Sequence, residues 1–270
     1  MVTRSLDVMS IFAIADLHLS MAPDIDKPMD IYGPRWYNHA GRLMENWREM
    51  VSDDDTVIVA GDISWGLKLQ EAKYDLDWIE SLPGRKVMYK GNHDLWWTGI
   101  TKLNKMYDNI TFVQNDCFAA EDFVVCGTRG WLTPDNDDFT ESDEKIYRRE
   151  LLRMEASLKA GVKYIHELRG KGTGKEEDIK SDENTISVQD FENYPEMIVV
   201  MHFPPVSKAA SFSGFQQLFE DYGIKRVFYG HIHGEDGFRN TIMGEHHGVD
   251  YQLISLDYLN CRPLLLERRV

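Results

Sequence analysis

TVIVAGD, residues 56–62, is a short apolar run, rich in β-branched residues, that ends on a glycine and an aspartate. Such a run predicts a buried β-strand with a polar residue at its carboxyl end. The same pattern occurs upstream, in residues 8–16, and downstream, in VMYKGNHD at residues 87–94. Between residues 62 and 87, apolar side chains recur at helical spacing. Strands that alternate with helices predict a parallel sheet, whose ligands lie at the carboxyl ends of its strands.

Five strand-like runs end in side chains that can bind metals. Their polar ends are Asp16-Leu17-His18, Gly61-Asp62, Gly91-Asn92-His93-Asp94, His202 after residues 197–201, and Gly230-His231-Ile232-His233 after residues 226–229. In a strand, residues i and i+2 point the same way, so Asp16 with His18, and His231 with His233, can each aim two ligands at one place. A single motif of this kind is more often a turn or a cap, but five together favour one metal site.

This order of motifs resembles the signature of the calcineurin-like metallophosphoesterases. The resemblance implies an α/β fold, namely a four-layer α/β/β/α sandwich of two mixed β-sheets flanked by helices. It also implies two divalent metal ions. The ligands that it assigns to the first ion are Asp16, His18, Asp62 and His233, and those for the second ion are Asp62, Asn92, His202 and His231. Asp62 can serve both ions because a carboxylate has two oxygens.

The resemblance further implies a metal-dependent phosphohydrolase, which hydrolyses a phosphomonoester or phosphodiester with a water activated between the two ions. Nitrogen and oxygen ligands without thiolate suit Mn, Fe, Zn or Co. His93 follows the ligand Asn92 without being a ligand in the family pattern, and it is the implied general acid. Asp94 is the candidate to orient the His93 imidazole. A nuclease on the same fold and a non-catalytic metal-binding scaffold stay open as alternatives.

The composition bears on partners and compartment. With a net charge of −15, the chain lacks the basic balance that nucleic-acid binding usually needs, so we expect a small phosphate-ester substrate. Three widely spaced cysteines without a CxxC motif are typical of reduced thiols in a cytoplasmic protein. No apolar stretch approaches the ~20 residues of a membrane span, so no membrane contact is expected. No sequence feature assigns an oligomeric state.

We expect residues 1–270 to form a single domain, because the motifs run from residue 16 to residue 233 and must converge. A helix is expected over residues 140–159, where apolar side chains share one face. The stretch after it is polar and rich in Gly, Lys, Glu and Asp, which indicates an insertion at about residues 162–194.

Other side chains have two interpretations each. Trp65 and Trp97 can wall a substrate pocket, although a place in the apolar core is favoured. Arg129 can meet a phosphate bidentately, although a surface position or an ion pair is favoured. The four histidines outside the motifs are expected at the surface or in packing: His39, His166, His246 and His247.

Overall fold

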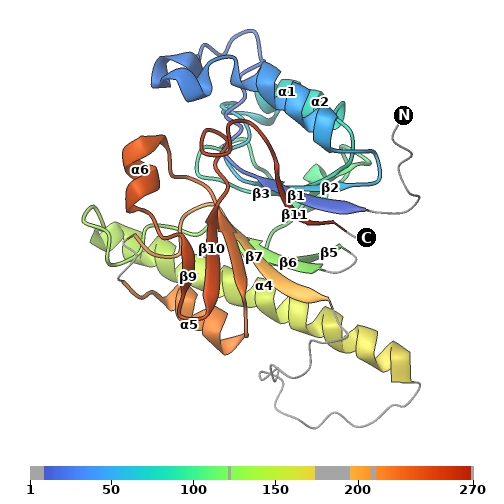
Figure 1. The fold of residues 1–270 in the computed structure, drawn as a ribbon, viewed down its shortest axis with the longest axis vertical. Helices are drawn as coiled ribbons and strands as arrows, with labels where there is room; N and C mark the ends of the chain where they lie inside the picture. Colours follow the sequence, from blue (N-terminus) through green and yellow to red (C-terminus); the bar gives the residue numbers. More distant parts are fainter. Residues whose placement is uncertain (1–8, 121–122, 174–194, 208–210, 269–270) are drawn as a thin grey trace.

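The computed structural model describes residues 9–120, 123–173, 195–207 and 211–268. Its strands form two sheets, and helices lie on the outer face of each sheet (Figure 1). The strands are β1 (Ser10–Ile14), β2 (Thr56–Ala60), β3 (Arg85–Tyr89), β4 (Ile110–Phe112), β5 (Cys117–Ala120), β6 (Phe123–Thr128), β7 (Glu196–Met201), β8 (Arg226–Tyr229), β9 (Gly244–His246), β10 (Val249–Leu253) and β11 (Leu264–Arg268). The helices are η1 (Met29–Tyr32), η2 (Pro34–Trp36), α1 (His39–Met50), α2 (Leu69–Glu80), α3 (Ile100–Leu103), α4 (Glu141–Thr173), α5 (Gly214–Asp221) and α6 (Gly234–Asn240).

The first sheet has the order β11-β1-β2-β3-β4. Strands β1 to β4 run parallel, and β11 returns antiparallel to β1, so the sheet is mixed. Helices α1 and α2 cover its outer face (Figure 1). Leu43 and Trp47 of α1 and Leu76 of α2 share a buried cluster with Val57 and Val59 of β2.

The second sheet has the order β5-β6-β7-β8-β10-β9. Its four inner strands are parallel, and the edge strands β5 and β9 are antiparallel to their neighbours. Helices α4 and α5 cover its outer face, where Met154 and Leu158 of α4 and Phe219 of α5 pack with Val124 and Val199.

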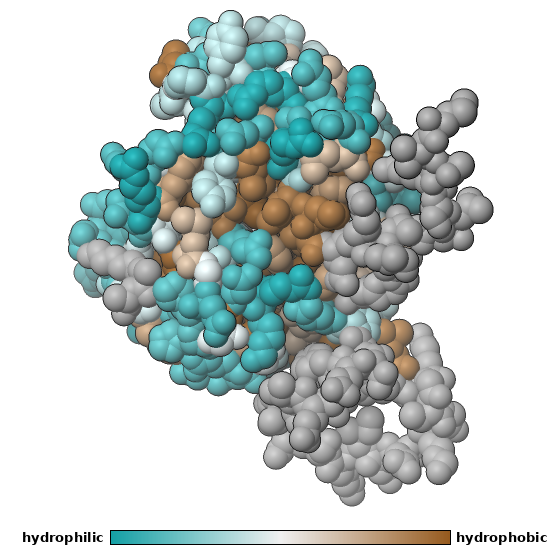
Figure 2. Space-filling model, viewed as in Figure 1, coloured by the Kyte–Doolittle hydropathy of each residue, from teal (hydrophilic) through white to brown (hydrophobic). Residues whose placement is uncertain are grey.

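A third apolar cluster fills the space between the two sheets. Ala13, Ile58 and Val87 reach it from the first sheet, and Val125 and Ile198 reach it from the second. Neighbouring residues of one strand point to opposite faces, so each inner strand is buried on both sides. Figure 2 shows the result on one face of the molecule, where hydrophobic residues form a band between the hydrophilic outer layers. These layers confirm the expected α/β/β/α sandwich.

Helix α4 is longer than the sequence predicted. It runs from Glu141 to Thr173, because Val162 and Ile165 extend its buried face beyond the expected end at residue 159. The first part of the insertion expected at about residues 162–194 is therefore helix, and residues 174–194 lie outside the described residues.

The entry into α1 interrupts a pattern in the sequence. Trp36, Ala40, Leu43 and Trp47 recur at helical spacing, but α1 begins at His39, after Asn38 with a left-handed φ of 47°. Trp36 instead ends the short turn η2 and is buried. Over the residues that the structure describes, no helix combines the length and the apolar character needed to cross a membrane.

Candidate metal centre

The predicted ligands follow the carboxyl ends of strands from both sheets. Asp16 follows β1, Asp62 follows β2 and Asn92 follows β3, whereas His202 follows β7 and His231 follows β8. Four of the seven predicted ligands have a left-handed backbone, with φ of 61° at Asp16, 44° at His18, 51° at Asp62 and 71° at His231. Non-glycine residues seldom adopt this conformation, and its clustering is typical of functional sites.

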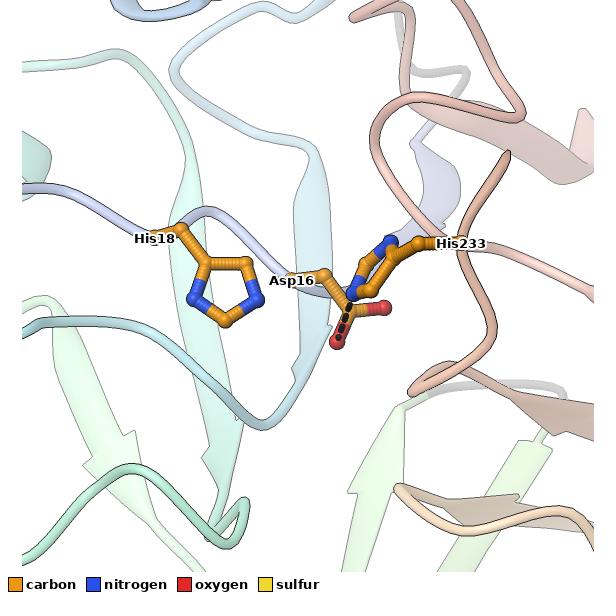
Figure 3. Close-up of side chains that lie close together, drawn as sticks. All are labelled: Asp16, His18 and His233. Carbon is orange, nitrogen blue, oxygen red and sulfur yellow. Dashed lines mark ion pairs between the residues drawn. The ribbon is translucent and has the colours of Figure 1, made fainter. Parts of the chain in front are cut away.

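Two groups of ligand atoms result. Asp16, His18 and His233 form the first group, in which the side chains converge (Figure 3), and Asp62, His202 and His231 form the second. Within each group the candidate ligand atoms lie within 4.8 Å of one another, which suits a shared cation. Asn92 joins the second group, since its Oδ1 lies 2.7 Å from Nε2 of His202.

Asp62 belongs to the second group and also lies close to the first. Its Oδ2 is 3.3 Å from Nε2 of His202 in the second group and 3.8 Å from Nε2 of His18 in the first. This carboxylate therefore occupies the position that a bridging ligand needs.

The electrostatics of these residues fit bound cations. Burial raises the pKa of the Asp16 carboxyl. Burial also opposes ionisation of Asp62, but the imidazoles of His202 and His18 outweigh it and lower the pKa of that carboxyl. Although burial disfavours its charged form, His202 has its pKa raised to about 9 by Asp62 and Asp16. The two carboxylates thus draw positive charge to the site, and a divalent ion can supply it in place of a proton.

Two of the other imidazoles are kept neutral, as metal ligation requires. Burial lowers the pKa of His231 to about 3 and holds the pKa of His18 well below its usual value. Nδ1 of His18 is buried and has no hydrogen-bond partner among the described residues. The Nε2 of His18, 3.8 Å from Oδ2 of Asp62, is the nitrogen that faces the site, and a neutral imidazole can offer a lone pair there to a cation.

A second layer of contacts orients two of the histidines. Nδ1 of His233 lies 2.9 Å from Oδ1 of Asp257, while Oδ2 of Asp257 accepts a hydrogen bond from the backbone of Gly234. Nδ1 of His202 lies 3.1 Å from the Ala60 carbonyl. In each case the contact leaves Nε2 for the site. Asp257 was not among the residues predicted from the sequence, although its place shortly after β10 repeats the pattern of an acid beyond a strand end.

The motif glycines provide room for these side chains. A Cβ on Gly91 would lie 2.1 Å from Oδ1 of Asp62, and one on Gly230 would lie 2.6 Å from Oδ2 of Asp16. Both distances are far below van der Waals contact, so a larger residue at either position would displace the carboxylate of a predicted ligand.

His93 lies beside the ligands and is open to solvent. Its side chain is 44% exposed, and its Nε2 is 4.0 Å from Oδ2 of Asp62. The backbone N–H of His93 donates to Oδ1 of Asp62 at 2.8 Å, and its ring lies 4.5 Å from that of Trp65. The imidazole thereby lies next to the two candidate ligand groups without belonging to either.

Asp94 differs from the expectation that it orients this imidazole. Its buried carboxylate accepts hydrogen bonds from the backbone of Ile63, Ser64 and Gly91, and from the indole of Trp96. The chain bends at residues 92–93, and Asp94 faces inward while His93 faces the site. Asp94 therefore joins the loops that follow β2 and β3.

The remaining candidates lie in the core, in an ion pair or along a cavity. Trp97 packs in the core, and Arg129 pairs with Glu150 at 3.3 Å, as favoured from the sequence. Trp65 instead stacks on His18, with ring centroids 4.8 Å apart, and lines a cavity of about 700 Å³. The cavity begins at the predicted ligands and is lined by His18, Met29, Tyr32, Gly33, Pro34, Arg35, Trp36, Asp62, Trp65, His93, His231, His233, Gly234, Glu235 and Asp257.

The chain belongs to the calcineurin-like phosphoesterases, since the model of that family matches residues 9–235. It is similar to the Gene 66 protein of Mycobacterium phage D29, with 33% identity over 105 residues, or 37% of this chain and 50% of that protein. It is also similar to the Gene 66 protein of Mycobacterium phage L5, with 43% identity over 56 residues, or 21% of this chain and 27% of that protein. The matches therefore span half or less of the length of these relatives.

Two solved structures are similar to the chain at lower sequence identity. One is a phosphopantetheinyl hydrolase from Mycobacterium tuberculosis, with 15% identity, a TM-score of 0.45 and 96% of each chain covered. The other is a purple acid phosphatase from yellow lupin, with 14% identity and a TM-score of 0.44, covering 84% of this chain and 38% of that one.

Proposed function

We propose that the protein is a metal-dependent phosphohydrolase that uses two divalent ions to hydrolyse a small phosphate ester. The observation that carries the proposal is the pair of largely buried Asp/His groups at the carboxyl edges of the two sheets, with Asp62 close to both. Membership of the calcineurin-like family supports the same chemistry.

The candidate ligands divide into one set for each of two ions. Asp16, His18 and His233 would hold the first, Asn92, His202 and His231 the second, and Asp62 would contact both. Their nitrogen and oxygen donors suit Mn, Fe, Zn or Co. Such ions supply a water of lowered pKa and offset the negative charge of the phosphate.

His93 donates a proton to the leaving oxygen in this proposal. It lies at the border between the ligand groups and the 700 Å³ cavity, so a group leaving the phosphorus into the cavity passes the imidazole. The expelled alkoxide is a strong base, and protonation by a positioned imidazole lowers the barrier to its departure. Trp65 limits the movement of the His93 ring by packing beside it.

The charge of the chain also guides the choice of substrate. A net charge of −15 disfavours a nucleic acid, which makes a small monoester or diester the proposed substrate. The three free cysteines support the cytoplasm as the proposed compartment.

The test is a paired assay on chelator-stripped protein reloaded with Mn²⁺. One sample receives bis-p-nitrophenyl phosphate and the other p-nitrophenyl phosphate, and metal content is measured on both. We expect hydrolysis that depends on the metal, and the preferred compound assigns the protein to diesters or monoesters. Bound metal without hydrolysis of either ester, or of a wider panel, would favour the non-catalytic scaffold instead.

A further inference from the structure

The cavity beside the metal ligands has an aromatic and apolar wall. Trp65, Trp36 and Met29 are buried or half-buried along it, and Tyr32 lines it while 66% exposed. Trp36 meets the rings of His18 and His233 edge-on, at centroid distances of 5.7 and 5.2 Å. The wall therefore continues directly from the ligand groups.

The segment that carries this wall, residues 29–36, is fastened in place by Arg35. Its guanidinium donates to Glu235 on α6 at 2.6 and 2.9 Å, and to the Asp257 carbonyl and Asn260 Oδ1 at 3.1 and 3.2 Å. Arg42 of α1 also donates to the Arg35 carbonyl at 2.8 Å. The contacts with Glu235, Asp257 and Asn260 span 200 or more residues, so they hold this segment against α6 and the loop after β10.

The charges around the cavity limit what it can bind. Among the described lining residues outside the ligand groups, Arg35 carries the positive charge. Its guanidinium already donates hydrogen bonds to Glu235, to the Asp257 carbonyl and to Asn260. Glu235 and Asp257 add negative charge. Lys27 is outside this lining, with its Nζ 5.5 Å from the centroid of the Trp65 ring. Further phosphates on a leaving group would meet the carboxylates of Glu235 and Asp257, whereas a flat apolar group would gain contact with the rings along the wall.

We propose that this cavity binds the leaving group of the phosphate ester, and that it selects a flat, largely apolar ring system held against Trp65, Trp36 and Tyr32. The inference rests on the proposed function, because the side of the site on which His93 can protonate the leaving oxygen is the side that opens into the cavity. A volume of about 700 Å³ lies within the usual range for a small-molecule site and accommodates a two-ring group.

The test measures equilibrium binding, which requires no turnover. Phenylphosphonate and 1-naphthylphosphonate share the same phosphonate and differ by one ring, and calorimetry on the Mn²⁺-loaded protein gives their Kd values. Burying the additional ring is expected to tighten binding about tenfold. Equal Kd values would overturn the inference.

Two exposed tyrosines provide a matched pair of variants. Tyr32→Ala removes a ring from the cavity, whereas Tyr37→Ala removes one that is 70% exposed and outside the lining. We expect Tyr32→Ala to bring the ratio of the two Kd values toward one, and Tyr37→Ala to keep it, with the metal content of both variants unchanged. A ratio that responds equally to both variants would contradict the assignment of the cavity.

The outcome separates this inference from the proposed function. Ester hydrolysis without any preference for naphthyl would overturn the inference alone. A naphthyl preference that depends on Tyr32, in a metal-loaded protein that hydrolyses no ester, would overturn the proposed function and keep the ring-binding cavity.

Discussion

At the scale of single residues, Asp62 and His93 are expected to fail in different ways. Asp62→Ala removes the carboxylate that lies near His18 and His202, so metal and activity should be lost together. His93→Ala leaves both ligand groups in place, so metal content should persist while turnover of an alkyl or phenyl ester falls ~10²–10⁴-fold. Metal analysis with kinetics separates the two. Unchanged turnover of the phenyl ester by His93→Ala would remove His93 from the role of proton donor, whereas a nitrophenyl ester needs little protonation and is a weak test.

Asp257 is expected to act through His233. Asp257→Asn keeps the size of the side chain but weakens the contact with Nδ1 of the imidazole, so metal affinity should fall by ~10–100-fold. Competition with a fluorescent chelator measures the change. Asp236→Asn, at a side chain that is 96% exposed on α6, is the matched control and should bind metal like the wild type. Equal affinities for Asp257→Asn and the wild type would exclude a role in holding His233.

At the scale of elements, Lys86 links β3 to the end of α2. Its side chain is fully buried, and its ammonium donates to the carbonyls of Glu80 and Leu82 at the C-terminus of α2. Burial lowers the pKa of Lys86 from 10.5 to about 8, although Glu80 and Asp53 oppose that shift. The unfolded chain therefore binds this proton more tightly than the folded one, so protonation favours unfolding, and stability from this group rises with pH between about 8 and 10.5.

Urea unfolding at several pH values tests this link. Between pH 7.5 and 9.5 the wild type should gain stability relative to Lys86→Met, which has no group to titrate there. Lys102→Met, at an exposed position on α3, should follow the wild type. If the free energy of unfolding changed with pH in the same way for the wild type and Lys86→Met, the lowered pKa of the buried Lys86 would be contradicted.

Prediction from the sequence succeeded where the signal is local. The strand ends carrying Asp16, Asp62 and His202 were found because an apolar run followed by a polar residue is visible within about eight residues. The end of α4 was missed, because a polar composition after residue 159 concealed the buried Val162 and Ile165. A helix of this length is decided by tertiary packing, which overrides composition.

Contacts between distant residues were beyond reach for a different reason. The bonds of Arg35 to Glu235 and of His233 to Asp257 depend on how loops from different strands approach one another in space. No periodicity in the sequence encodes such pairs. The antiparallel return of β11 beside β1 belongs to the same class, since it joins residues more than 250 positions apart.

At the scale of the whole molecule, each ligand group joins the two sheets. Asp16 and His18 come from the first sheet and His233 from the second, while Asp62 comes from the first sheet and His202 and His231 from the second. A cation that binds either group therefore binds the folded chain and loses its site on unfolding. At a free metal concentration of 100 times Kd, this linkage adds about 2.7 kcal/mol of stability.

Calorimetry is expected to show the linkage as one shifted transition. About 2.7 kcal/mol corresponds to a rise in Tm of roughly 5–10 °C for a chain of this size. Mn²⁺ should raise the Tm of the wild type by that amount, a chelator should reverse it, and Asp62→Ala should not respond. Since each candidate ligand group draws on both sheets, we propose that residues 1–270 unfold as a single domain. A metal held by residues of both sheets must stabilise both sheets. Two separate transitions, of which only one shifts with Mn²⁺, would therefore show that the sheets unfold independently.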